Sequence, residues 1–237
     1  MFNRFKDFMI NINSNDFSNH LILNTSITED AVKDEQGLIY FGCGCFWGAE
    51  KCFWKLPGVI TTAVGYSGGE VSNPSYNQVC SGLTGHAEVV KVVWNKDKID
   101  ITDLLKMFWE CHDPTQKDRQ GNDYGSQYRS AIYYTDDRDI ELINSSKKAY
   151  QKLLSENKYG QIETEIKKSK NFFYAEKYHQ QYLAIKSNRQ YCSASPTKIE
   201  LGDFIGAKYK LDKKIWTNFD WRINKCVLRS DNYQLEN

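Results

Sequence analysis

Long apolar runs are missing from this sequence. A membrane-spanning helix needs ~20 consecutive apolar residues, and no run in the chain approaches that length. The opening stretch, MFNRFKDFMININSNDFSNH, lacks the unbroken apolar core of a secretory signal, and its aspartates are untypical of a transit peptide. We therefore expect a cytoplasmic protein with no membrane as a partner.

An excess of charge is also missing. The chain has 31 Lys and Arg against 30 Asp and Glu, which gives a net charge of +1. No dense run of basic residues stands out either, so we expect no nucleic acid as a partner. With 237 residues, 41% of them hydrophobic, the chain is long enough for one globular domain with a substantial core and tails.

Cysteine-pairing motifs are absent, although cysteine is not. The seven cysteines are odd in number, which rules out a full set of structural disulfides, and no C-x-x-C occurs. The four histidines show no paired ligand spacing, so we expect no metal site and no cofactor. Cytoplasmic cysteines stay reduced unless they are catalytic or bind metal, and the question becomes which of these thiols reacts.

Hydrophobic periodicity predicts the order of the secondary structure. We expect strands at 37–43, 59–66, 86–95, 128–135 and 161–167, and helices at 45–56, 101–109, 137–156 and 174–185. From 37 to 135 the order is strand, helix, strand, strand, helix, strand. This order is typical of an α+β ferredoxin-like split β-α-β sandwich, with the helices on one face. The long loops at 67–85, with one helical turn at 75–80, and at 112–127 are expected to carry function.

The stretch FGCGCFWG presents Cys45 as a candidate nucleophile. Gly42 and Gly44 let the backbone turn sharply between a strand and a helix start. A helix N-terminus favours a thiolate, and cysteines so placed can have a pKa of ~3.5–7.5. We therefore expect a lowered pKa for Cys45. The alternative is that Cys45 is a small buried residue, with Phe46 and Trp47 in the core.

Glu88 lies in the predicted strand HAEVVKVVW, on the same face as Val90, Val92 and Trp94. Burial of a carboxylate on an apolar face raises its pKa, and a raised pKa suits a general acid near neutral pH. The alternative is that Glu88 lies at the solvated end of the strand or pairs with a lysine.

Six blocks of the sequence occur together, in one order and with compatible spacing, from about Leu38 to Cys192. The blocks are GCFWGAEKCFWKLPGV, GYSGG, NPSYNQVCSGLTGHAEVV, FWECHDP, RQGNDYGSQYRSAIY and YHQQYL. This arrangement resembles peptide methionine sulfoxide reductase of the A type. The resemblance implies a ferredoxin-like α/β fold and a protein-repair enzyme that reduces the S epimer of methionine sulfoxide, free or in proteins.

The resemblance also implies a role for each matching residue. Cys45 is the expected nucleophile, Phe46 and Trp47 form the pocket for the substrate methyl group, and Glu88 is the catalytic acid. The oxygen of the substrate is surrounded by Tyr76, Asp123 and Tyr128.

Cys192, in the YC pair after YHQQYL, matches the cysteine that converts the Cys45 sulfenic acid into a disulfide. Thioredoxin is the implied reductant. These matches divide the chain into an N-terminal extension (1–36), a catalytic domain (37–190) and a C-terminal tail with the resolving cysteine (191–237). We expect a monomer.

The chain departs from the family pattern after Cys192. The sequence SASPTKIELG replaces the usual glycine-rich run, and Cys226, which has no counterpart, is either a second recycling thiol or inert. Two other functions also stay open. One is acyl transfer by a Cys–His pair with His86, His112 or His179 as the base, and the other is non-catalytic binding of oxidised peptides.

Overall fold

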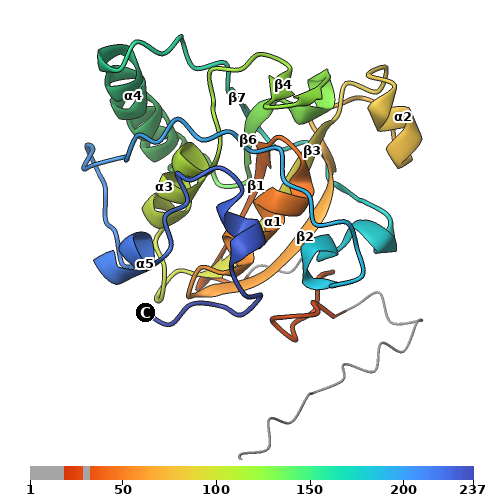
Figure 1. The fold of residues 1–237 in the computed structure, drawn as a ribbon, viewed down its shortest axis with the longest axis horizontal. Helices are drawn as coiled ribbons and strands as arrows, with labels where there is room; N and C mark the ends of the chain where they lie inside the picture. Colours follow the sequence, from red (N-terminus) through yellow and green to blue (C-terminus); the bar gives the residue numbers. More distant parts are fainter. Residues whose placement is uncertain (1–18, 29–32) are drawn as a thin grey trace, which may run out of the picture.

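Figure 1 shows the fold in a computed structural model, which describes residues 19–28 and 33–237. A six-stranded sheet forms its centre, in the order β7-β6-β1-β3-β2-β8. The strands are β1 Gln36–Cys43, β2 Val59–Ser67, β3 Ala87–Asn95, β6 Ser130–Tyr134, β7 Glu165–Lys168 and β8 Phe173–Tyr174. A separate two-stranded hairpin consists of β4 Arg119–Gln120 and β5 Asp123–Tyr124.

The four inner strands confirm the predicted split β-α-β arrangement. They lie in the order β6-β1-β3-β2 and pair antiparallel, and the chain enters them as β1, α1, β2, β3, α3, β6. The helices are α1 Phe46–Trp54, α2 Tyr76–Cys80, α3 Ile101–Cys111, α4 Ile140–Glu156 and α5 Lys213–Asn218. The parallel pairing of β6 with β7 extends the sheet at one edge.

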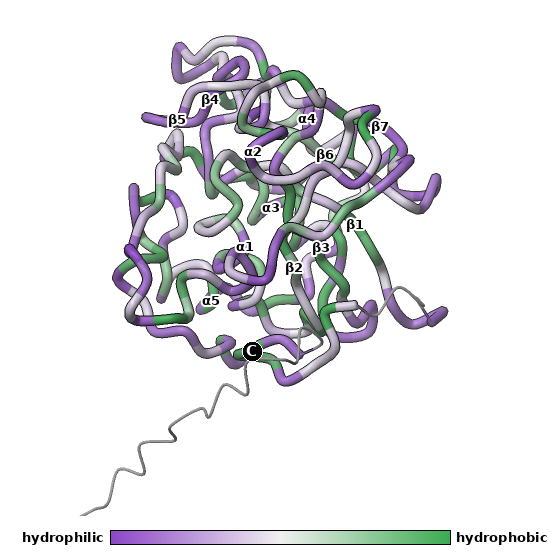
Figure 2. Tube along the Cα trace, turned by 90° about the vertical axis from the view of Figure 1, so that its right-hand side faces the viewer, coloured by the Kyte–Doolittle hydropathy of each residue, from purple (hydrophilic) through white to green (hydrophobic). Residues whose placement is uncertain are grey.

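The main core lies between the sheet and helices α1 and α3 (Figure 2), where the apolar segments run through the interior. Phe41 of β1 stacks on Phe53 of α1 at 4.9 Å between ring centroids and on Phe108 of α3 at 5.1 Å. Helix α3 is capped by Asp100, whose side chain accepts a hydrogen bond from the Thr102 N–H at 3.0 Å. These contacts fix α1, and with it the residues at its start.

The predicted helix at 174–185 is wrong. Two short 3₁₀ turns, Lys177–His179 and Tyr182–Ala184, follow β8 instead, and Gln181 between them has a left-handed backbone with φ of 45°. The Gln180 amide bonds the backbone of Val64 in β2, and Gln181 bonds the buried carboxylate of Glu50. These tertiary hydrogen bonds outweigh the weak helical preference of the segment.

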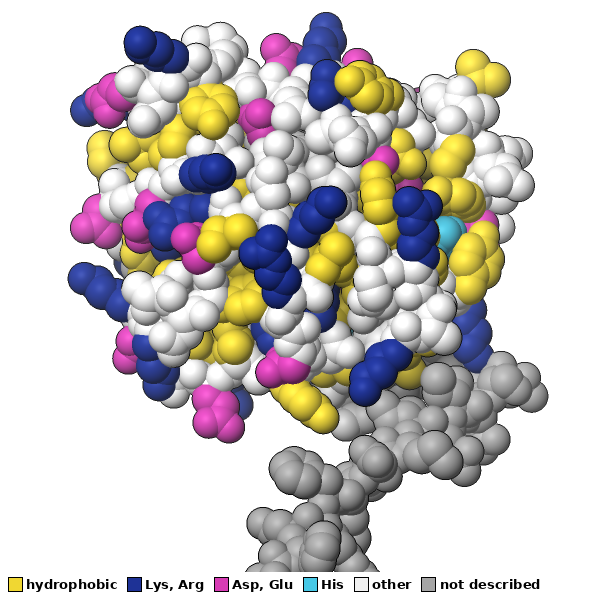
Figure 3. All heavy atoms as spheres, viewed as in Figure 1, with side chains coloured by type: hydrophobic (Ala, Val, Ile, Leu, Met, Phe, Trp, Pro, Cys, Tyr) yellow, Lys and Arg dark blue, Asp and Glu magenta, His cyan; other side chains and the backbone are white. Residues whose placement is uncertain are grey.

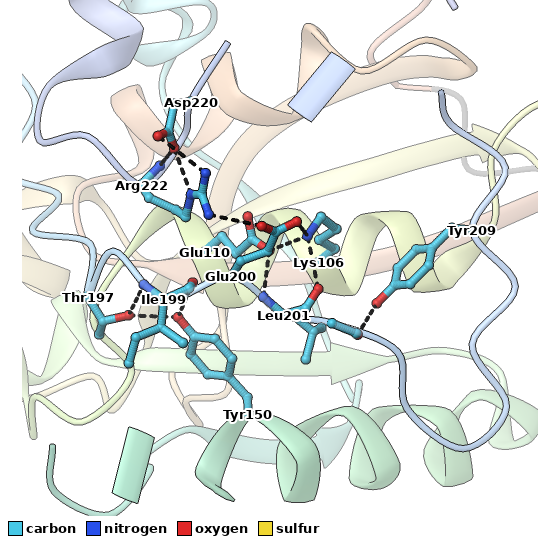
Figure 4. A network of polar contacts seen from close by, with 11 residues as sticks. Lys106, Glu110, Tyr150, Thr197, Ile199, Glu200, Leu201, Tyr209, Asp220 and Arg222 are labelled. Atoms are coloured by element: carbon cyan, nitrogen blue, oxygen red, sulfur yellow. Dashed lines mark hydrogen bonds and ion pairs between the residues drawn. The ribbon is translucent and has the colours of Figure 1, made fainter. Parts of the chain in front are cut away.

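The segment after Cys192 lies against the outside of α3 and α4 (Figure 4). Leu201 donates its N–H to Glu110 at 2.7 Å and accepts from Lys106 at 2.9 Å. Tyr150 of α4 bonds the Thr197 hydroxyl at 2.7 Å. The C-terminal end of the chain, residues 226–237, then packs across α1.

Within this C-terminal end, residues 231–233 provide the polar partners of a buried cation, the ammonium of Lys55. The Lys55 side chain, 1% exposed, places its ammonium 2.7 Å from the Asp231 carboxylate and 2.8 Å from the Tyr233 carbonyl. The extension 1–36 falls partly outside the described residues, although His20 in it is buried and bonds Thr62 of β2. Among the described residues, no helix has the length and apolar character needed to cross a membrane.

Candidate functional site

Cys45 occupies the turn between β1 and α1. Gly44 before it has φ of +88°, a conformation that L side chains rarely adopt, and a Cβ there would lie 2.5 Å from the Cβ of Gln120. Cys45 itself is the N-cap residue of α1 and is half-buried. The backbone N–H of Trp47 bonds its sulfur. The predicted placement of this thiol at a helix start is therefore confirmed.

The predicted lowering of the Cys45 pKa is wrong for the protein without substrate. Burial raises the pKa of the Cys45 thiol well above its ordinary value, and the nearby charge of Glu88 raises it further. The Trp47 N–H lowers the pKa but does not outweigh these effects. Cys45 is thus a protonated thiol at neutral pH, and its reaction requires that the proton be removed as substrate reacts.

Glu88, the second residue of β3, lines the site. Its side chain is buried, and its Oε2 accepts the Phe46 N–H at 3.0 Å, directly beside Cys45. Burial raises the pKa of Glu88 to about 8, although the Phe46 hydrogen bond opposes the shift. The raised pKa agrees with the prediction, and the burial of the side chain excludes the alternative of a solvated strand end. Near pH 7 this carboxyl holds a proton that it can donate.

A cavity of about 250 Å³ lies in front of these two groups. Seven of the eight predicted site residues line it: Cys45, Phe46, Trp47, Tyr76, Glu88, Asp123 and Tyr128. Tyr76 begins α2 in the loop 67–85, while Asp123 and Tyr128 come from the loop 112–127 and its end. The two long loops therefore meet at the site, as expected. Burial raises the pKa of Tyr76 and Tyr128, so both phenols stay protonated as hydrogen-bond donors.

Phe46 and Trp47 form the aromatic wall of the cavity, and residues of the two 3₁₀ turns pack against this wall. Trp47 stacks on Tyr182 with 3.7 Å between ring centroids, and its indole N–H donates to Nδ1 of His179 at 3.1 Å. Burial lowers the pKa of His179 to about 4, so the ring is neutral and can accept this bond. Sequence reasoning identified His179 only as a possible base and missed Tyr182, although both residues lie in the block YHQQYL.

Two further residues, Arg189 and Tyr191, complete the cavity lining and were also missed. The Tyr191 hydroxyl donates to Oδ1 of Asp123 at 2.7 Å, so the residue before Cys192 is part of the site. Only this adjacency to the predicted resolving cysteine could have marked Tyr191 in the sequence.

Cys192 is the predicted site residue that does not line the cavity. Its side chain is buried against Gly48 of α1, and it is close enough to Cys45 that the charge of its thiolate would raise the pKa of Cys45. Burial raises the pKa of Cys192 itself to about 11. Cys226 is half-buried and donates to the Trp221 carbonyl at 3.7 Å, and burial raises its pKa to about 12.

The histidines do not provide a base for Cys45. His86 and His112 have both ring nitrogens in hydrogen bonds to other groups, and His179 is committed to Trp47. Cys43, Cys111 and His112 have potential metal-ligating atoms within 4.8 Å of one another. They lie in the core where the end of β1 meets the end of α3, and the His112 bonds to Phe108 and Ser130 leave its ring no free nitrogen, so this group packs as part of the interior.

The surface seen in Figure 3 carries mixed charges. Lys and Arg side chains are interspersed with acidic and uncharged ones across this face, which agrees with the near-zero net charge. The cavity is distinguished by its chemistry: a thiol, a protonated carboxyl, three phenols and an aromatic wall.

Comparison with known proteins identifies the family that this chain resembles. The family model described as peptide methionine sulfoxide reductase matches residues 37–209. The chain is 49% identical to peptide methionine sulfoxide reductase MsrA of Vibrio vulnificus, over 76% of this chain and 85% of that protein. It is 51% identical to the human mitochondrial peptide methionine sulfoxide reductase, over 75% of each chain.

Solved structures agree with these relatives. Methionine sulfoxide reductase A of Corynebacterium diphtheriae superposes with a TM-score of 0.67 at 38% identity, over 78% of this chain and 89% of that one. The reduced form of Mxr1 from Saccharomyces cerevisiae gives a TM-score of 0.61 at 34% identity, over 69% of this chain and 92% of that one.

Proposed function

Because the chain belongs to the peptide methionine sulfoxide reductase family, whose members reduce methionine sulfoxide, we propose that Cys45, Glu88 and Cys192 carry out this reaction here. The enzyme reduces methionine sulfoxide to methionine at the expense of thiols. One observation supports the assignment of roles most directly. The Phe46 N–H holds the Glu88 carboxyl next to Cys45, in the lining of an aromatic cavity.

The first step transfers oxygen from substrate to enzyme. The Cys45 sulfur attacks the sulfoxide sulfur while Glu88 donates its proton to the sulfoxide oxygen, and Glu88 then takes up the thiol proton. The oxygen then passes to Cys45: the new bond between the two sulfurs and the sulfur–oxygen bond of the substrate break, a sulfur–oxygen bond forms on Cys45, and methionine leaves. Cys45–SH and sulfoxide become Cys45–SOH and thioether, so atoms and protons balance and the carboxyl is regenerated.

The surrounding groups stabilise the developing charge and select the substrate. Tyr76 and Tyr128 keep their protons and can bond the oxygen as negative charge accumulates on it. The rings of Phe46 and Trp47 offer an apolar recess for the S-methyl group. A site with oxygen donors on one side and an apolar recess on the other can discriminate the two sulfoxide epimers, and we propose that it takes the S epimer.

The second step closes a disulfide. The Cys192 thiol attacks the sulfur of Cys45–SOH, a sulfur–sulfur bond forms, and water leaves with the thiol proton and the hydroxyl. We propose thioredoxin as the dithiol that reduces this bond. All seven cysteines are free thiols in the structure, and we propose a reducing compartment such as the cytoplasm for the enzyme.

The test is turnover of each sulfoxide epimer with a dithiol, in wild type and in Cys45→Ser. We expect methionine from the S epimer alone and none from the serine variant. Equal use of both epimers would contradict the proposed pocket, and full activity in the variant would contradict the nucleophile.

The disulfide requires its own measurement. Mass mapping after one turnover without reductant should find Cys45 linked to Cys192. A link between Cys45 and Cys226 would move the resolving role to the second thiol.

A further inference from the structure

Cys192 is held in a defined place in the reduced protein. On its N-terminal side the Tyr191 hydroxyl donates to Asp123 at 2.7 Å, and on its C-terminal side the Ser195 N–H donates to the Gln120 side chain at 3.1 Å. Asp123 and Gln120 both belong to the hairpin β4–β5. The segment 191–195 therefore lies across this hairpin, with the thiol between two anchor points.

Gly48 of α1 lies directly beneath this thiol. A Cβ built on Gly48 would lie 2.6 Å from the Cys192 sulfur and 3.4 Å from the Cys192 Cβ. The first distance is far inside van der Waals contact, so the sulfur occupies the space that a side chain at position 48 would take.

The backbone does not explain this glycine. Gly48 is the third residue of α1, and its φ lies outside the positive region that requires glycine. Glycine is among the poorest helix-forming residues, and alanine at an unobstructed helical position would be preferred. The close approach of the Cys192 sulfur is the feature of the site that requires the missing side chain.

We propose that Gly48 is a positioning residue for the second step, and that it provides the seat for the Cys192 sulfur. This inference rests on the proposed role of Cys192. Gly48 follows Cys45 by three residues, and residues so spaced on a helix face the same side. A sulfur seated on Gly48 therefore approaches Cys45–SOH along the first turn of α1.

Contacts on both sides of Cys192 limit the positions that its sulfur can take, which makes the packing of this sulfur on Gly48 important. Residues 197–201 are bound to α3 and α4 through Tyr150, Lys106 and Glu110 (Figure 4). Upstream, Tyr182 is stacked on Trp47. Cys192 thus belongs to a short loop fixed at both ends, and a displaced thiol has few alternative routes to Cys45.

The test is Gly48→Ala, followed by rapid quenching after one equivalent of methionine S-sulfoxide. Methionine release should stay within about twofold of wild type, because Gly48 does not line the cavity. Formation of the Cys45–Cys192 disulfide, measured by mass mapping of alkylated peptides, should slow by at least about tenfold. Closure at the wild-type rate, or slowed methionine release with normal closure, would overturn the inference.

A double-mutant cycle tests the contact itself without relying on activity. Gly48→Ala should lower Tm in the wild-type background and leave it unchanged or raise it in Cys192→Ala, where the sulfur is gone. An equal loss of Tm in both backgrounds would show that the sulfur is not the obstacle. If Gly48→Ala fails to fold alone, recovery of folding in the double variant supports the seat, and failure in both overturns it.

Cys192→Ser separates this inference from the proposed function. If this variant still turns over at the wild-type rate with thioredoxin, Cys192 is not the resolving thiol and the proposed second step fails. If it stops after one methionine while Gly48→Ala closes normally, only the role of Gly48 fails.

Discussion

Replacing Glu88 by Gln removes the proton of the first step while keeping an oxygen for the Phe46 N–H. General acid catalysis typically contributes about 10²–10⁴-fold. Methionine release should slow by about that factor, which corresponds to about 3–5 kcal/mol of activation free energy. The same substitution removes a charge that raises the pKa of Cys45. The thiol should therefore become more acidic even though the enzyme becomes slower.

Burial of Glu88 also links stability to pH. Its pKa rises from 4.5 to about 8 on folding, so the folded chain keeps a proton that the unfolded chain releases. A raised pKa gives stability that is complete below pH 4.5 and is lost as pH rises through about 8. The loss is about 5 kcal/mol at 1.36 kcal/mol per pKa unit. Glu88→Gln has no such proton, so its free energy of unfolding should not fall in this way. Relative to wild type, the free energy of unfolding of the variant should rise by several kcal/mol between pH 5 and pH 8.

Two measurements check this pair of effects. Quenched single turnovers give the rate of methionine release, and denaturant unfolding at pH 5 and pH 8 gives the free energies. Glu141→Gln, an exposed glutamate at the start of α4, is the matched control and should change neither. A Glu88→Gln enzyme that releases methionine at the wild-type rate, or a stability difference independent of pH, would refute the reasoning about the buried acid.

Three further outcomes are expected. Cys192→Ser should release one methionine per enzyme and then stop with thioredoxin, whereas continued turnover would point to Cys226; product counting decides. His179→Phe removes the acceptor of the Trp47 indole, and loss of a buried hydrogen bond of about 1–3 kcal/mol should raise KM by about tenfold with a smaller effect on kcat, which steady-state kinetics would show. Deleting residues 226–237 removes the partners of Lys55 and the buried side chain of Val227, which alone contributes about 1.5–3 kcal/mol, so Tm should fall clearly in a thermal melt; an unchanged Tm would contradict the role given to this segment.

Much of the sheet could be predicted because its signals are local. The β-branched runs of β2 and β3 and the apolar spacing of α3 each depend on a few neighbouring residues. The high pKa of Glu88 was also predictable, since its strand neighbours are apolar and the strand is central.

The missed features depend on contacts between distant parts of the chain. The segment 174–185 is not helical because Gln180 and Gln181 bond groups more than 100 positions earlier. The thiol pKa of Cys45 was predicted in the wrong direction because its burial and the Glu88 charge come from other elements. The course of residues 193–237 could not be predicted because it is set by side chains of α1, α3 and α4 and by Lys55 after α1.

The packing of residues 231–235 over α1 has a consequence for synthesis on the ribosome. Lys55 is made early, yet Asp231 and Tyr233, which neutralise and solvate its ammonium, emerge almost 180 positions later. The acceptor of the Trp54 indole N–H, the Asn232 carbonyl, is likewise made late. A nascent chain that already contains every residue of the cavity therefore still lacks the groups that cover and pair with Lys55 beside α1. We expect the cavity around Cys45 and Glu88 to reach its native structure only after residues 231–235 have been translated.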